Sequence, residues 1–370
     1  MTTMKPLSDI CSVHTGSQLN RDEMLDIGQF PVINGGKIAS GYTNSYNEHG
    51  QTITISQGGE SAGFVNWIET NFWAGAHCYV VQPQESIDNR FLYHSLKNSE
   101  YSLQASKQGA GIPGLNRKTL LKHLIFVPSL IEQKRIVSIL DTFIDAMVNI
   151  RKQIEFRQKQ FEFFRNKLLD ENSADVKTIA LEELFTFKNG LNIGKDFFGT
   201  GKPIIMFTNV FNSRFIDSSM VINKVNISEN ELERINAHVG DVFFTRTSET
   251  KEDVGYASVL IEEIKECTYA GFLIRARPIT DKLLPAYCKY CFSTPKVRAA
   301  IVSKSSFTTR ASLTGSGLGK VTIPVPSINK QRHVVDILDA IESTISNLEA
   351  QLAYRQKQYE YYRNKLLTIE

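Results

Sequence analysis

Residues 127–169 read VPSLIEQKRIVSILDTFIDAMVNIRKQIEFRQKQFEFFRNKLL, and residues 325–367 read VPSINKQRHVVDILDAIESTISNLEAQLAYRQKQYEYYRNKLL. The second segment lies 198 residues after the first, aligns with it without a gap, and is identical to it at nearly half of its positions. Self-similarity at a fixed interval is the signature of an internal repeat. The chain of 370 residues therefore has two halves of related design.

Each copy of the repeat has the pattern of one long helix. A proline stands just before the expected start, a serine that suits the N-cap follows it, and no Pro or Gly interrupts the rest. Apolar residues recur at alternating steps of four and three, which is typical of the contact seam of a coiled coil. They are Ile136, Leu140, Phe143, Met147, Ile150, Ile154, Phe161, Phe164 and Leu168 in the first copy, and Val334, Leu338, Ile341, Ile345, Leu348, Leu352, Tyr359, Tyr362 and Leu366 in the second.

One position of each seam is polar, Arg157 in the first copy and Arg355 in the second. Such a residue can specify register or partner at some cost in stability. Alternatively, its stem can follow the seam while the guanidinium group reaches solvent. The sequence leaves both interpretations open.

The length of the repeat constrains the path of the chain. About 38 helical residues extend over roughly 55 Å, and only a short polar link at residues 170–175 precedes the next domain. If the two seams pair, the second helix must therefore run back antiparallel to the first. This predicts a domain at residues 1–126, a spacer helix at 127–171, a second domain at 172–324 and a second spacer helix at 325–370, related by a pseudo-two-fold.

The two segments that precede the helices begin alike and then diverge. Leu7–Gly16 and Leu181–Gly190 both have the pattern of a short helix followed by a strand that ends in glycine. Helices are expected at Asn89–Ser99 and Pro285–Phe292. Strand-like runs bounded by turn residues lie at Phe30–Ile33, Thr52–Ser56, Phe64–Ile68 and Cys78–Val81, and at Pro203–Val210, Asp241–Arg246, Ala257–Ile261 and Ala270–Ala276. The predicted fold class is α+β, with two similar mixed α/β domains separated by an antiparallel pair of long helices.

Charge is distributed unevenly along the chain. The formal net charge is only +3, yet residues 90–122 carry six basic residues and one acid, and residues 275–320 carry nine basic residues and one acid. Two basic segments at matching places in the repeat favour contact with phosphate. Five scattered cysteines indicate reduced thiols, and no stretch has the length of a membrane span, so we expect a cytoplasmic protein.

Three motifs resemble catalytic or metal sites but lack the context that such sites need. Gly59–Gly63 matches the G-x-S-x-G nucleophile elbow around Ser61, but the following Phe64–Ile68 alternates like a strand where that motif requires a helix. Gly315–Lys320 resembles a phosphate loop but precedes a strand-like run. Cys288-x-x-Cys291 has no second pair at zinc spacing. We therefore expect no catalytic residue and no metal site in this chain.

The order of these segments resembles the specificity subunit of type I restriction–modification systems, and the resemblance covers the whole chain. It rests on the helix starts Phe126–Gln133 and Ile323–Gln331, on the segment Gly240–Ser248, and on the first-domain patterns Ile33–Gly36 and Gly111–Asn116. The resemblance implies two target-recognition domains that read a bipartite DNA site whose unread spacer is set by the helices. It also implies modification subunits, two in number, that bring S-adenosylmethionine chemistry, and restriction subunits that use ATP and Mg.

Candidate contact residues follow from this resemblance and from side-chain chemistry. Base contacts are expected from polar and aromatic loop residues, and phosphate contacts from lysine and arginine. The candidates for bases are Asn34, Lys37, Tyr42, Ser56, Gln57, Ser61, Trp67, Trp73 and His77, and Asn209, Asn212, Arg214, Arg246, Thr247, Ser248 and Thr250. Those for phosphates are Lys107, Arg117, Lys118, Lys304, Arg310 and Lys320. A partner interface is expected at Arg157, Phe161, Phe164, Arg355, Tyr359 and Tyr362.

Two other functions compete with DNA recognition. A coiled-coil adaptor that bridges two proteins would keep the repeat but tolerate reversal of charge in the basic segments. A serine hydrolase that uses Ser61 would react with a fluorophosphonate. DNA binding that weakens with salt distinguishes recognition from the adaptor.

Overall fold

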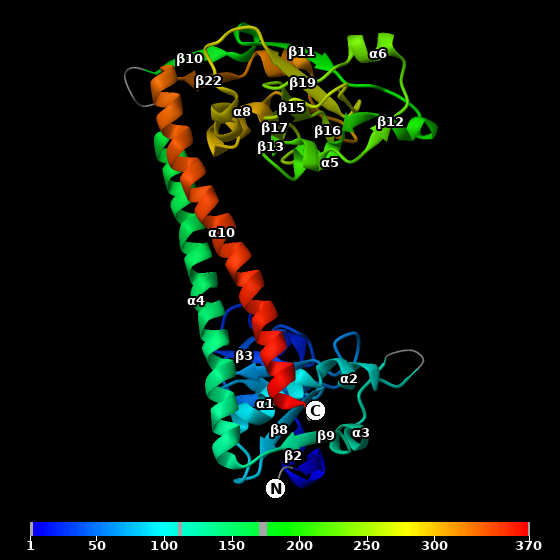
Figure 1. Cartoon of the computed structure of the whole chain (residues 1–370), viewed down its shortest axis with the longest axis vertical. Coiled ribbons are helices and arrows are strands. Elements are labelled where there is room, and N and C mark those ends of the chain that lie inside the picture. Colours follow the sequence, from blue (N-terminus) through cyan, green and yellow to red (C-terminus); the bar gives the residue numbers. More distant parts are fainter. Residues whose placement is uncertain (1–2, 110–112, 170–175, 369–370) are drawn as a thin grey trace. The chain divides into compact units, whose positions relative to one another are not determined.

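The computed structural model describes residues 3–109, 113–169 and 176–368. The chain forms two compact units. Unit 1 consists of Met1–Lys152 and Glu349–Glu370, and unit 2 of Gln153–Leu348. The two long helices are α4 (Leu130–Leu168) and α10 (Ile328–Leu367), and each begins in one unit and ends in the other (Figure 1).

The long helices confirm the pattern that the repeat predicts. They contain 39 and 40 residues and begin two residues after Pro128 and Pro326. At each start a serine hydroxyl accepts a backbone N–H from three residues ahead, at 3.4 Å in both helices. The predicted link at residues 170–175 lies outside the described residues, and the domain boundaries proposed from the sequence stay a prediction.

The seam residues of the two helices pack together inside each unit. In unit 1, Leu140 and Met147 of α4 share a buried cluster with Tyr359 and Leu367 of α10. In unit 2, Phe161 of α4 lies in a cluster with Val334 and Leu338 of α10, together with strand and helix residues of the same unit. In unit 1 the first part of α4 thus packs against the last part of α10. In unit 2 the last part of α4 packs against the first part of α10. The helices are therefore antiparallel, as the seam predicts.

Unit 1 combines an antiparallel sheet with short helices. The main sheet has the order β2-β8-β5-β6, and a second sheet has the order β4-β3-β7 with β3 and β7 parallel. The strands are β1 (Thr3–Pro6), β2 (Cys11–Thr15), β3 (Phe30–Ile33), β4 (Gly41–Thr43), β5 (Thr52–Ser56), β6 (Val65–Ile68), β7 (Trp73–Ala74), β8 (Cys78–Pro83) and β9 (Leu124–Val127). The helices are α1 (Asn89–Asn98), α2 (Glu100–Ala105) and α3 (Arg117–Leu121), with 3₁₀ turns at Leu7–Asp9 and Arg21–Glu23.

Unit 2 has a mixed five-stranded sheet of order β11-β19-β15-β17-β13 and two smaller sheets of order β14-β12-β18 and β16-β21-β20. The strands are β10 (Lys177–Ala180), β11 (Phe185–Asn189), β12 (Phe198–Ile205), β13 (Phe215–Ile216), β14 (Lys224–Val225), β15 (Val242–Thr245), β16 (Thr247–Ser248), β17 (Ala257–Leu260), β18 (Thr268–Tyr269), β19 (Leu273–Pro278), β20 (Ser306–Phe307), β21 (Ala311–Ser312) and β22 (Thr322–Val325). The helices are α5 (Phe207–Phe211), α6 (Glu229–Arg234), α7 (Pro285–Cys291), α8 (Pro295–Ser303) and α9 (Gly315–Gly319), with 3₁₀ turns at Leu181–Glu183, Lys195–Phe197 and Ser218–Met220.

Both units repeat one frame around the start of their long helix. The first strand of each unit pairs antiparallel with the strand just before the helix, β1 with β9 and β10 with β22. The fully buried Leu7 and Leu181 then begin a 3₁₀ turn, and their backbone N–H groups donate to His123 O at 2.9 Å and Val321 O at 2.8 Å. The similar openings of the two domains therefore fold in the same way.

A buried glutamine fixes each domain to the start of its long helix. Gln133 and Gln331 are 1% and 0% exposed. Their side-chain oxygens accept the backbone N–H of Asp88 at 2.8 Å and of Leu284 at 2.9 Å, the residues that precede α1 and α7. Their amide nitrogens donate to the carbonyl of the proline before the helix, at 3.0 and 2.9 Å. Removal of such a side chain leaves buried partners unsatisfied, at a cost of about 1–3 kcal/mol.

In unit 1 a polar network joins α1 to both long helices. Asp141 of α4 accepts hydrogen bonds from Arg90 Nε and His94 Nε2, both at 2.9 Å. The other ring nitrogen of His94 lies 3.2 Å from the hydroxyl of Tyr359 in α10. Burial lowers the pKa of His94 despite the neighbouring carboxylate, so the ring is held neutral between its two partners.

Unit 2 uses the equivalent positions of the repeat with different chemistry. Asp339, which corresponds to Asp141, accepts a hydrogen bond from the hydroxyl of Tyr290 and pairs with Lys289 at 3.1 Å. The ring of Tyr290 lies 5.9 Å, between centroids, from that of Phe161, which corresponds to Tyr359. The same helix positions therefore anchor a domain helix in each unit.

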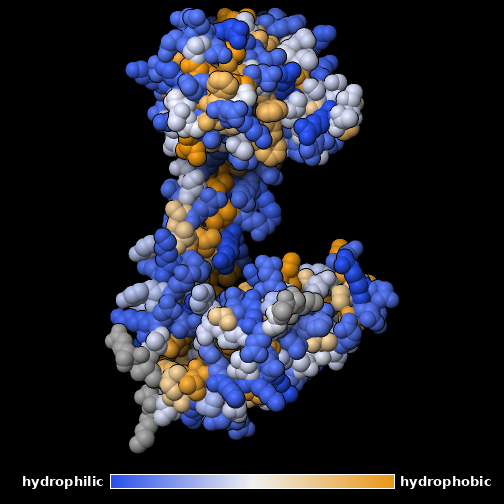
Figure 2. Space-filling model, turned by 90° about the vertical axis from the view of Figure 1, so that its right-hand side faces the viewer, coloured by the Kyte–Doolittle hydropathy of each residue, from blue (hydrophilic) through white to orange (hydrophobic). Residues whose placement is uncertain are grey.

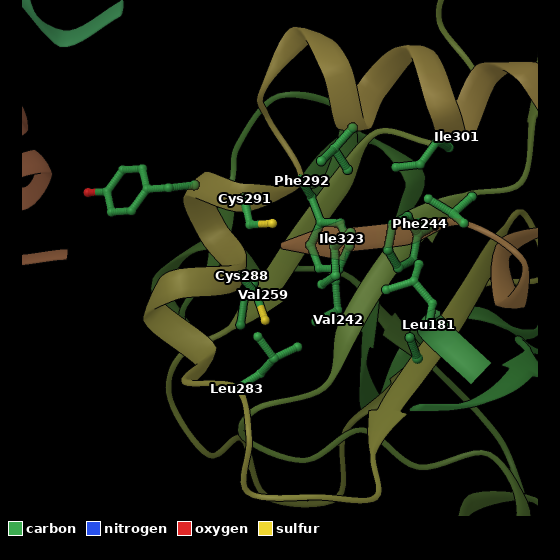
Figure 3. Packing of buried hydrophobic residues seen from close by; sticks show 14 of the residues in the cluster. Leu181, Val242, Phe244, Val259, Leu283, Cys288, Cys291, Phe292, Ile301 and Ile323 are labelled. Carbon is green, nitrogen blue, oxygen red and sulfur yellow. The ribbon is translucent and has the colours of Figure 1, made fainter. Parts of the chain in front are cut away.

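The core of unit 2 lies between α7, α8 and the five-stranded sheet. Cys288 and Cys291 of α7 share one buried cluster with Val242, Phe244 and Val259 of the strands (Figure 3). Burial raises the pKa of Cys288 to about 12, which keeps the thiol neutral. Among the described residues no group of three or more His, Cys, Asp or Glu is placed to hold a metal ion. Both cysteines are buried in the hydrophobic core of unit 2, where they pack against the strands.

The sequence placed several elements of unit 2 wrongly. The run Pro203–Val210 is not one strand, because β12 ends at Ile205 and α5 begins at Phe207. The side chain of Asn209 accepts the backbone N–H of Met206 at 2.8 Å, a local bond that competes with strand pairing. The expected strand at Ala270–Ala276 begins only at Leu273, and the helices α8 and α9 of unit 2, like α2 of unit 1, were not foreseen. In the described part of the chain no helix has both the length and the apolar character of a membrane span.

Replacement of Tyr359 by alanine should destabilise unit 1. The side chain is 5% exposed and contacts His94, so its loss creates a cavity and removes a polar partner. We expect a loss of about 3 kcal/mol in the free energy of unfolding, measured by urea denaturation with circular dichroism. Tyr361→Ala, at a side chain 60% exposed, is the matched control and should change that value by less than about 0.5 kcal/mol. Equal effects of the two variants would contradict this role for Tyr359.

Candidate nucleic-acid interface

Several loops of unit 1 meet at one end of its main sheet. We call residues 34–38, 57–61, 75–77, 107–109 and 113–118 the loop cluster. The backbone N–H of Gln57 donates to His77 O at 3.0 Å, and that of Leu115 donates to Gln57 O at 2.8 Å. The side chain of Asn34 accepts the N–H of His77 at 3.3 Å. These bonds join segments that are far apart in sequence into one surface. Residues 110–112, which include the first two residues of the motif Gly111–Asn116, lie outside the described residues.

The loop cluster presents cationic and polar side chains to solvent. Lys37, His77, Arg117 and Lys118 are exposed. Arg117 and Lys118 form the first turn of α3, where the side chain of Asn116 caps the helix by accepting the N–H of Lys118 at 2.8 Å. Glu60 is the exposed acid of the same surface. The arrangement suits contacts to phosphate and to base edges.

Other candidates of unit 1 have structural partners. Ser56 is 5% exposed, and Lys107 donates to the carbonyl of Glu60 at 2.9 Å. The indole N–H of Trp73 donates to Ser17 O at 3.0 Å. The indole N–H of Trp67 donates to Glu69 at 2.7 Å, and the Arg90 guanidinium lies 4.6 Å from the centroid of the indole ring. Gln57 is half-buried within the loop cluster, and Tyr42 on β4 is 39% exposed.

Ser61 lies in the hairpin that joins β5 to β6. The two strands pair antiparallel, and the strand β6 follows the turn where a nucleophile elbow would have a helix. The carbonyl of Ser61 accepts the backbone N–H of Phe64 at 2.9 Å. The hairpin interpretation of the motif is confirmed, and this geometry does not support a serine hydrolase.

Unit 2 has a hollow lined by three phenylalanine rings, of which Phe211 and Phe272 are exposed and Phe207 is half-buried. Phe207 and Phe211 of α5 stack at 5.5 Å between ring centroids, and Phe272 lies before β19 with 61% of its surface exposed. The volume of the hollow is about 500 Å³. We call it the aromatic hollow; the residues that line it are Phe207, Phe211, Thr247, Ser248, Glu249, Thr250, Asp253, Phe272 and Arg310. Exposed aromatic faces beside hydroxyl groups suit contacts to bases.

Some of the base- and phosphate-contact candidates of unit 2 line the aromatic hollow, and others lie outside it. Thr247, Ser248, Thr250 and Arg310 line it together. Arg246 is directed to the carbonyl of Gly271 at 3.5 Å. The remaining candidates lie outside the hollow: Asn209, bonded to Met206 and Met220; Arg214, paired with Glu342; and the exposed Asn212, Lys304 and Lys320. The three phenylalanines were missed because sequence does not distinguish an exposed ring from a core ring.

Most of the expected partner-interface residues serve the fold of their own unit. Phe161 and Tyr359 are 6% and 5% exposed, and Phe164 packs partly buried against the same core as Phe161. Arg157 and Arg355 each donate to the glutamine three residues later on the same helix, at 2.7 and 2.8 Å. These local bonds agree with guanidinium groups that leave the seam. The ring of Tyr362, 39% exposed, stacks on Phe143 at 5.4 Å.

A different set of aromatic residues is exposed on the long helices. Phe156 and Phe163 of α4 are 62% and 59% exposed, and Tyr354 and Tyr361 of α10 are 62% and 60% exposed. Each tyrosine stands 198 residues after its phenylalanine, so the two pairs occupy equivalent positions of the repeat. Figure 2 shows apolar surface along the long helices beside the mainly hydrophilic surface of the domains. We call these four residues the exposed aromatic pairs.

Comparison with known proteins gives a consistent family assignment. The family model described as "Type I restriction modification DNA specificity domain" matches residues 2–156 and again residues 173–354. The chain is 28% identical over 300 residues to the specificity subunit of the type I restriction enzyme EcoKI of Escherichia coli, an alignment that covers 75% of this chain and 64% of that subunit. It thus spans slightly less than two thirds of that relative.

Two further proteins resemble the chain over almost its whole length. A putative type I restriction enzyme specificity subunit of Haemophilus influenzae is 25% identical over 384 residues, with 99% of this chain and 95% of that protein covered. The crystal structure of the S subunit of a type I restriction–modification system from Mycoplasma genitalium matches with a TM-score of 0.65 at 19% identity, over 100% of this chain and 97% of that chain. The latter likeness shows that the fold is shared.

Neutralising the cations of the loop cluster should weaken DNA binding without unfolding the chain. Arg117→Gln with Lys118→Gln removes two exposed charges, so we expect an unchanged thermal midpoint. Each lost phosphate contact should reduce the slope of log affinity against log salt by about 0.9. The measurement is fluorescence anisotropy with a duplex over a salt series. Lys134→Gln, an exposed lysine on α4 of the same unit, is the control, and an unchanged slope for the double variant would exclude these residues as phosphate contacts.

Proposed function

The chain belongs to the family of type I restriction–modification DNA specificity subunits, and on this premise we propose that it recognises a bipartite, asymmetric DNA site and recruits methyltransferase subunits to it. The family match covers both halves of the chain. Each half contributes one domain of the same frame, so each domain is proposed to read one part of the site. The chain itself is proposed to carry out no catalytic step.

The observation that carries this proposal is a shared frame with different surfaces. The strand pairs β1–β9 and β10–β22, the buried Gln133 and Gln331, and the long helices are repeated. The surfaces differ, because unit 1 presents the mainly polar loop cluster and unit 2 presents the aromatic hollow. Side chains of different chemistry read different bases. Two unlike half-sites, and hence an asymmetric target, are the consequence.

The two surfaces suit different kinds of base contact. Lys37, His77 and the amide of Gln57 supply hydrogen-bonding groups in unit 1. In unit 2 the phenylalanine rings suit the methyl group of thymine, and Thr247 and Ser248 can bond to base edges beside them. Arg310 lies at the same hollow and is 3.4 Å from Glu249, a surface pair that phosphate or a base can displace.

The exposed aromatic pairs support docking of two copies of one partner. Phe156 and Phe163 on one helix match Tyr354 and Tyr361 on the other, so each repeat offers two exposed aromatic rings at equivalent positions. Aromatic residues are enriched in protein interfaces, where they bury large areas at low entropic cost. We propose that methyltransferase subunits, one per repeat, cover these pairs. Those subunits would hold S-adenosylmethionine, and restriction subunits would bring ATP, Mg and cleavage.

Exchange of the first domain should change one half of the methylated sequence. A chain in which residues 1–126 come from another specificity subunit keeps the second domain and both long helices. We expect adenine methylation at a site with a new first half and an unchanged second half, measured by whole-genome methylation mapping in cells that supply the methyltransferase. The reciprocal exchange of residues 172–324 is the matched control. An unchanged mark, or no adenine mark from the parent chain, would contradict the proposal and favour a coiled-coil adaptor.

Replacement of one residue in each exposed aromatic pair should reduce the number of bound methyltransferase subunits, by one subunit for each pair that is changed. Phe163→Ser and Tyr361→Ser affect side chains that are 59% and 60% exposed, so the fold should persist. We expect each single variant to capture one methyltransferase subunit and the double variant to capture none, as counted by mass photometry or native mass spectrometry. Ile131→Ser on α4, 84% exposed and outside the aromatic pairs, is the control. Two bound subunits on the double variant would place the docking surface elsewhere.

A further inference from the structure

We propose that a pocket of unit 2 lined by three arginines binds a phosphate group of the DNA backbone, and that Arg165 of the long helix α4 is its main ligand. The inference rests on the proposed DNA-recognition function and adds a contact from the spacer helix itself. We call this hollow of about 490 Å³ the arginine pocket. The residues that line it are Arg165, Phe211, Asn212, Ser213, Arg214, Phe215, Tyr256, Ala257, Phe292, Ser293 and Arg298.

The charge of the arginine pocket favours an anion. Arg165, Arg214 and Arg298 line it, and no carboxylate is among the described residues that do so. A neighbouring hollow, also of about 490 Å³, shares Arg165 and Arg214 but is lined in addition by Glu162 and Glu342. The two hollows therefore differ in net charge although they share two cations. An anion is attracted to the first and is opposed by the acids of the second.

Arg165 is the cation of the arginine pocket whose hydrogen bond and ring contact both stay within its own helix. Its Nε donates to the side chain of Asn166 at 3.1 Å, and the described part of the chain gives it no ion pair within 4.0 Å. Burial, and then the charge of Arg214, lower the pKa of Arg165. A guanidinium that is half-buried beside a second guanidinium gains from an anion placed between the two.

The other two arginines are already fixed by internal contacts. Arg214 pairs with Glu342, and its guanidinium carbon lies 4.7 Å from the centroid of the Phe161 ring. Arg298 donates to the carbonyls of Glu252 at 3.0 Å and Val254 at 2.8 Å, and to that of Gly255. These contacts hold both groups in place without cancelling the charge of Arg298, because its partners are neutral. The pocket is thus preorganised, and Arg165 is the guanidinium that its own helix alone contacts among the described residues.

The internal repeat supplies a comparison for Arg165. Its equivalent 198 residues later is Arg363, and each guanidinium lies near the ring of the aromatic residue four positions earlier, at 5.9 Å for Arg165 and 5.2 Å for Arg363. Arg363 donates to the side chain of Asn98 from α1 at 3.2 Å. Arg165 instead lines a solvent-open pocket beside Arg214. One repeat position is therefore used for packing in unit 1 and is available for a ligand in unit 2.

The position of the arginine pocket identifies the source of the phosphate. Phe211 lines both the arginine pocket and the aromatic hollow, so the two sites adjoin at this residue. That ring contacts the ring of Tyr256 edge-on, with centroids 4.9 Å apart. A nucleotide strand carries a phosphate and a base on each sugar. A strand whose base enters the aromatic hollow can therefore place a neighbouring phosphate in the arginine pocket.

The test uses the full chain in complex with its methyltransferase subunits. Fluorescence anisotropy over a KCl series compares two duplexes. One contains the sequence that the complex methylates in cells, and the other contains the same bases in scrambled order. For Arg165→Gln we expect about tenfold weaker binding to both duplexes and a slope against log salt that is lower by about 0.9, with an unchanged methylated sequence. Arg165→Lys keeps the charge and should keep the slope. Arg363→Gln, the repeat-matched control, should leave the slope unchanged.

Several outcomes would overturn the arginine pocket as a DNA-phosphate site. These are an unchanged slope for Arg165→Gln, the same loss of slope for Arg363→Gln, or weaker binding to the methylated duplex alone. Calorimetry with inorganic pyrophosphate tests a free phosphate compound as the ligand: binding that Arg165→Gln abolishes, with DNA affinity unaltered, would also overturn the proposal. If the wild-type complex methylates a bipartite site, the proposed function stands even when the Arg165 variants contradict a phosphate contact in the arginine pocket.

Discussion

The rest of the structure depends on the burial of the two helix seams within two units that each take residues from both long helices. The core of unit 1 is completed by Tyr359 and Leu367, which come from the last turns of α10. The core of unit 2 includes Phe161 and Leu169 from the end of α4 and its junction. Unit 1 combines two separate segments of the chain and unit 2 is one continuous segment, but each long helix contributes to both units. Packing of the helices and folding of the domains are consequently one process in each unit.

This shared packing explains the chemistry of the repeated positions. Gln133 and Gln331 keep the same hydrogen bonds in both units, because each must satisfy the backbone just before a domain helix. Asp141 and Asp339 also keep their position, but their partners differ, with His94 in one unit and Tyr290 in the other. The helix supplies a constant acceptor, and each domain supplies its own donor. Domains with different surfaces can thus be joined to the same helices.

Sequence reasoning succeeded where one local pattern determines the outcome. The four-and-three spacing, the prolines before the helices and the absence of Gly and Pro define α4 and α10 to within a few residues. The hairpin around Ser61 and the helix that carries Cys288 were also correct. It failed at Pro203–Val210, where the Asn209 side chain bonds to nearby backbone and an apolar run becomes strand and helix. The interface role expected for Phe161 and Tyr359 stays a prediction, and both side chains are buried within their own units.

By itself the sequence determined the repeat, the antiparallel helices, the two domains of one frame and the family to which the chain is similar, because periodic spacing and local caps act between near neighbours. Only the tertiary structure decided which side chains are free to meet a ligand. Phe163 and Phe164 are adjacent and chemically identical, yet Phe163 is 59% exposed and Phe164 packs against the core. Arg165 and Arg363 occupy one repeat position, yet Arg363 bonds Asn98 while Arg165 lines a pocket. The solvent exposure of a side chain and its bonding partners depend on residues that are distant in sequence, and only the fold brings these residues together.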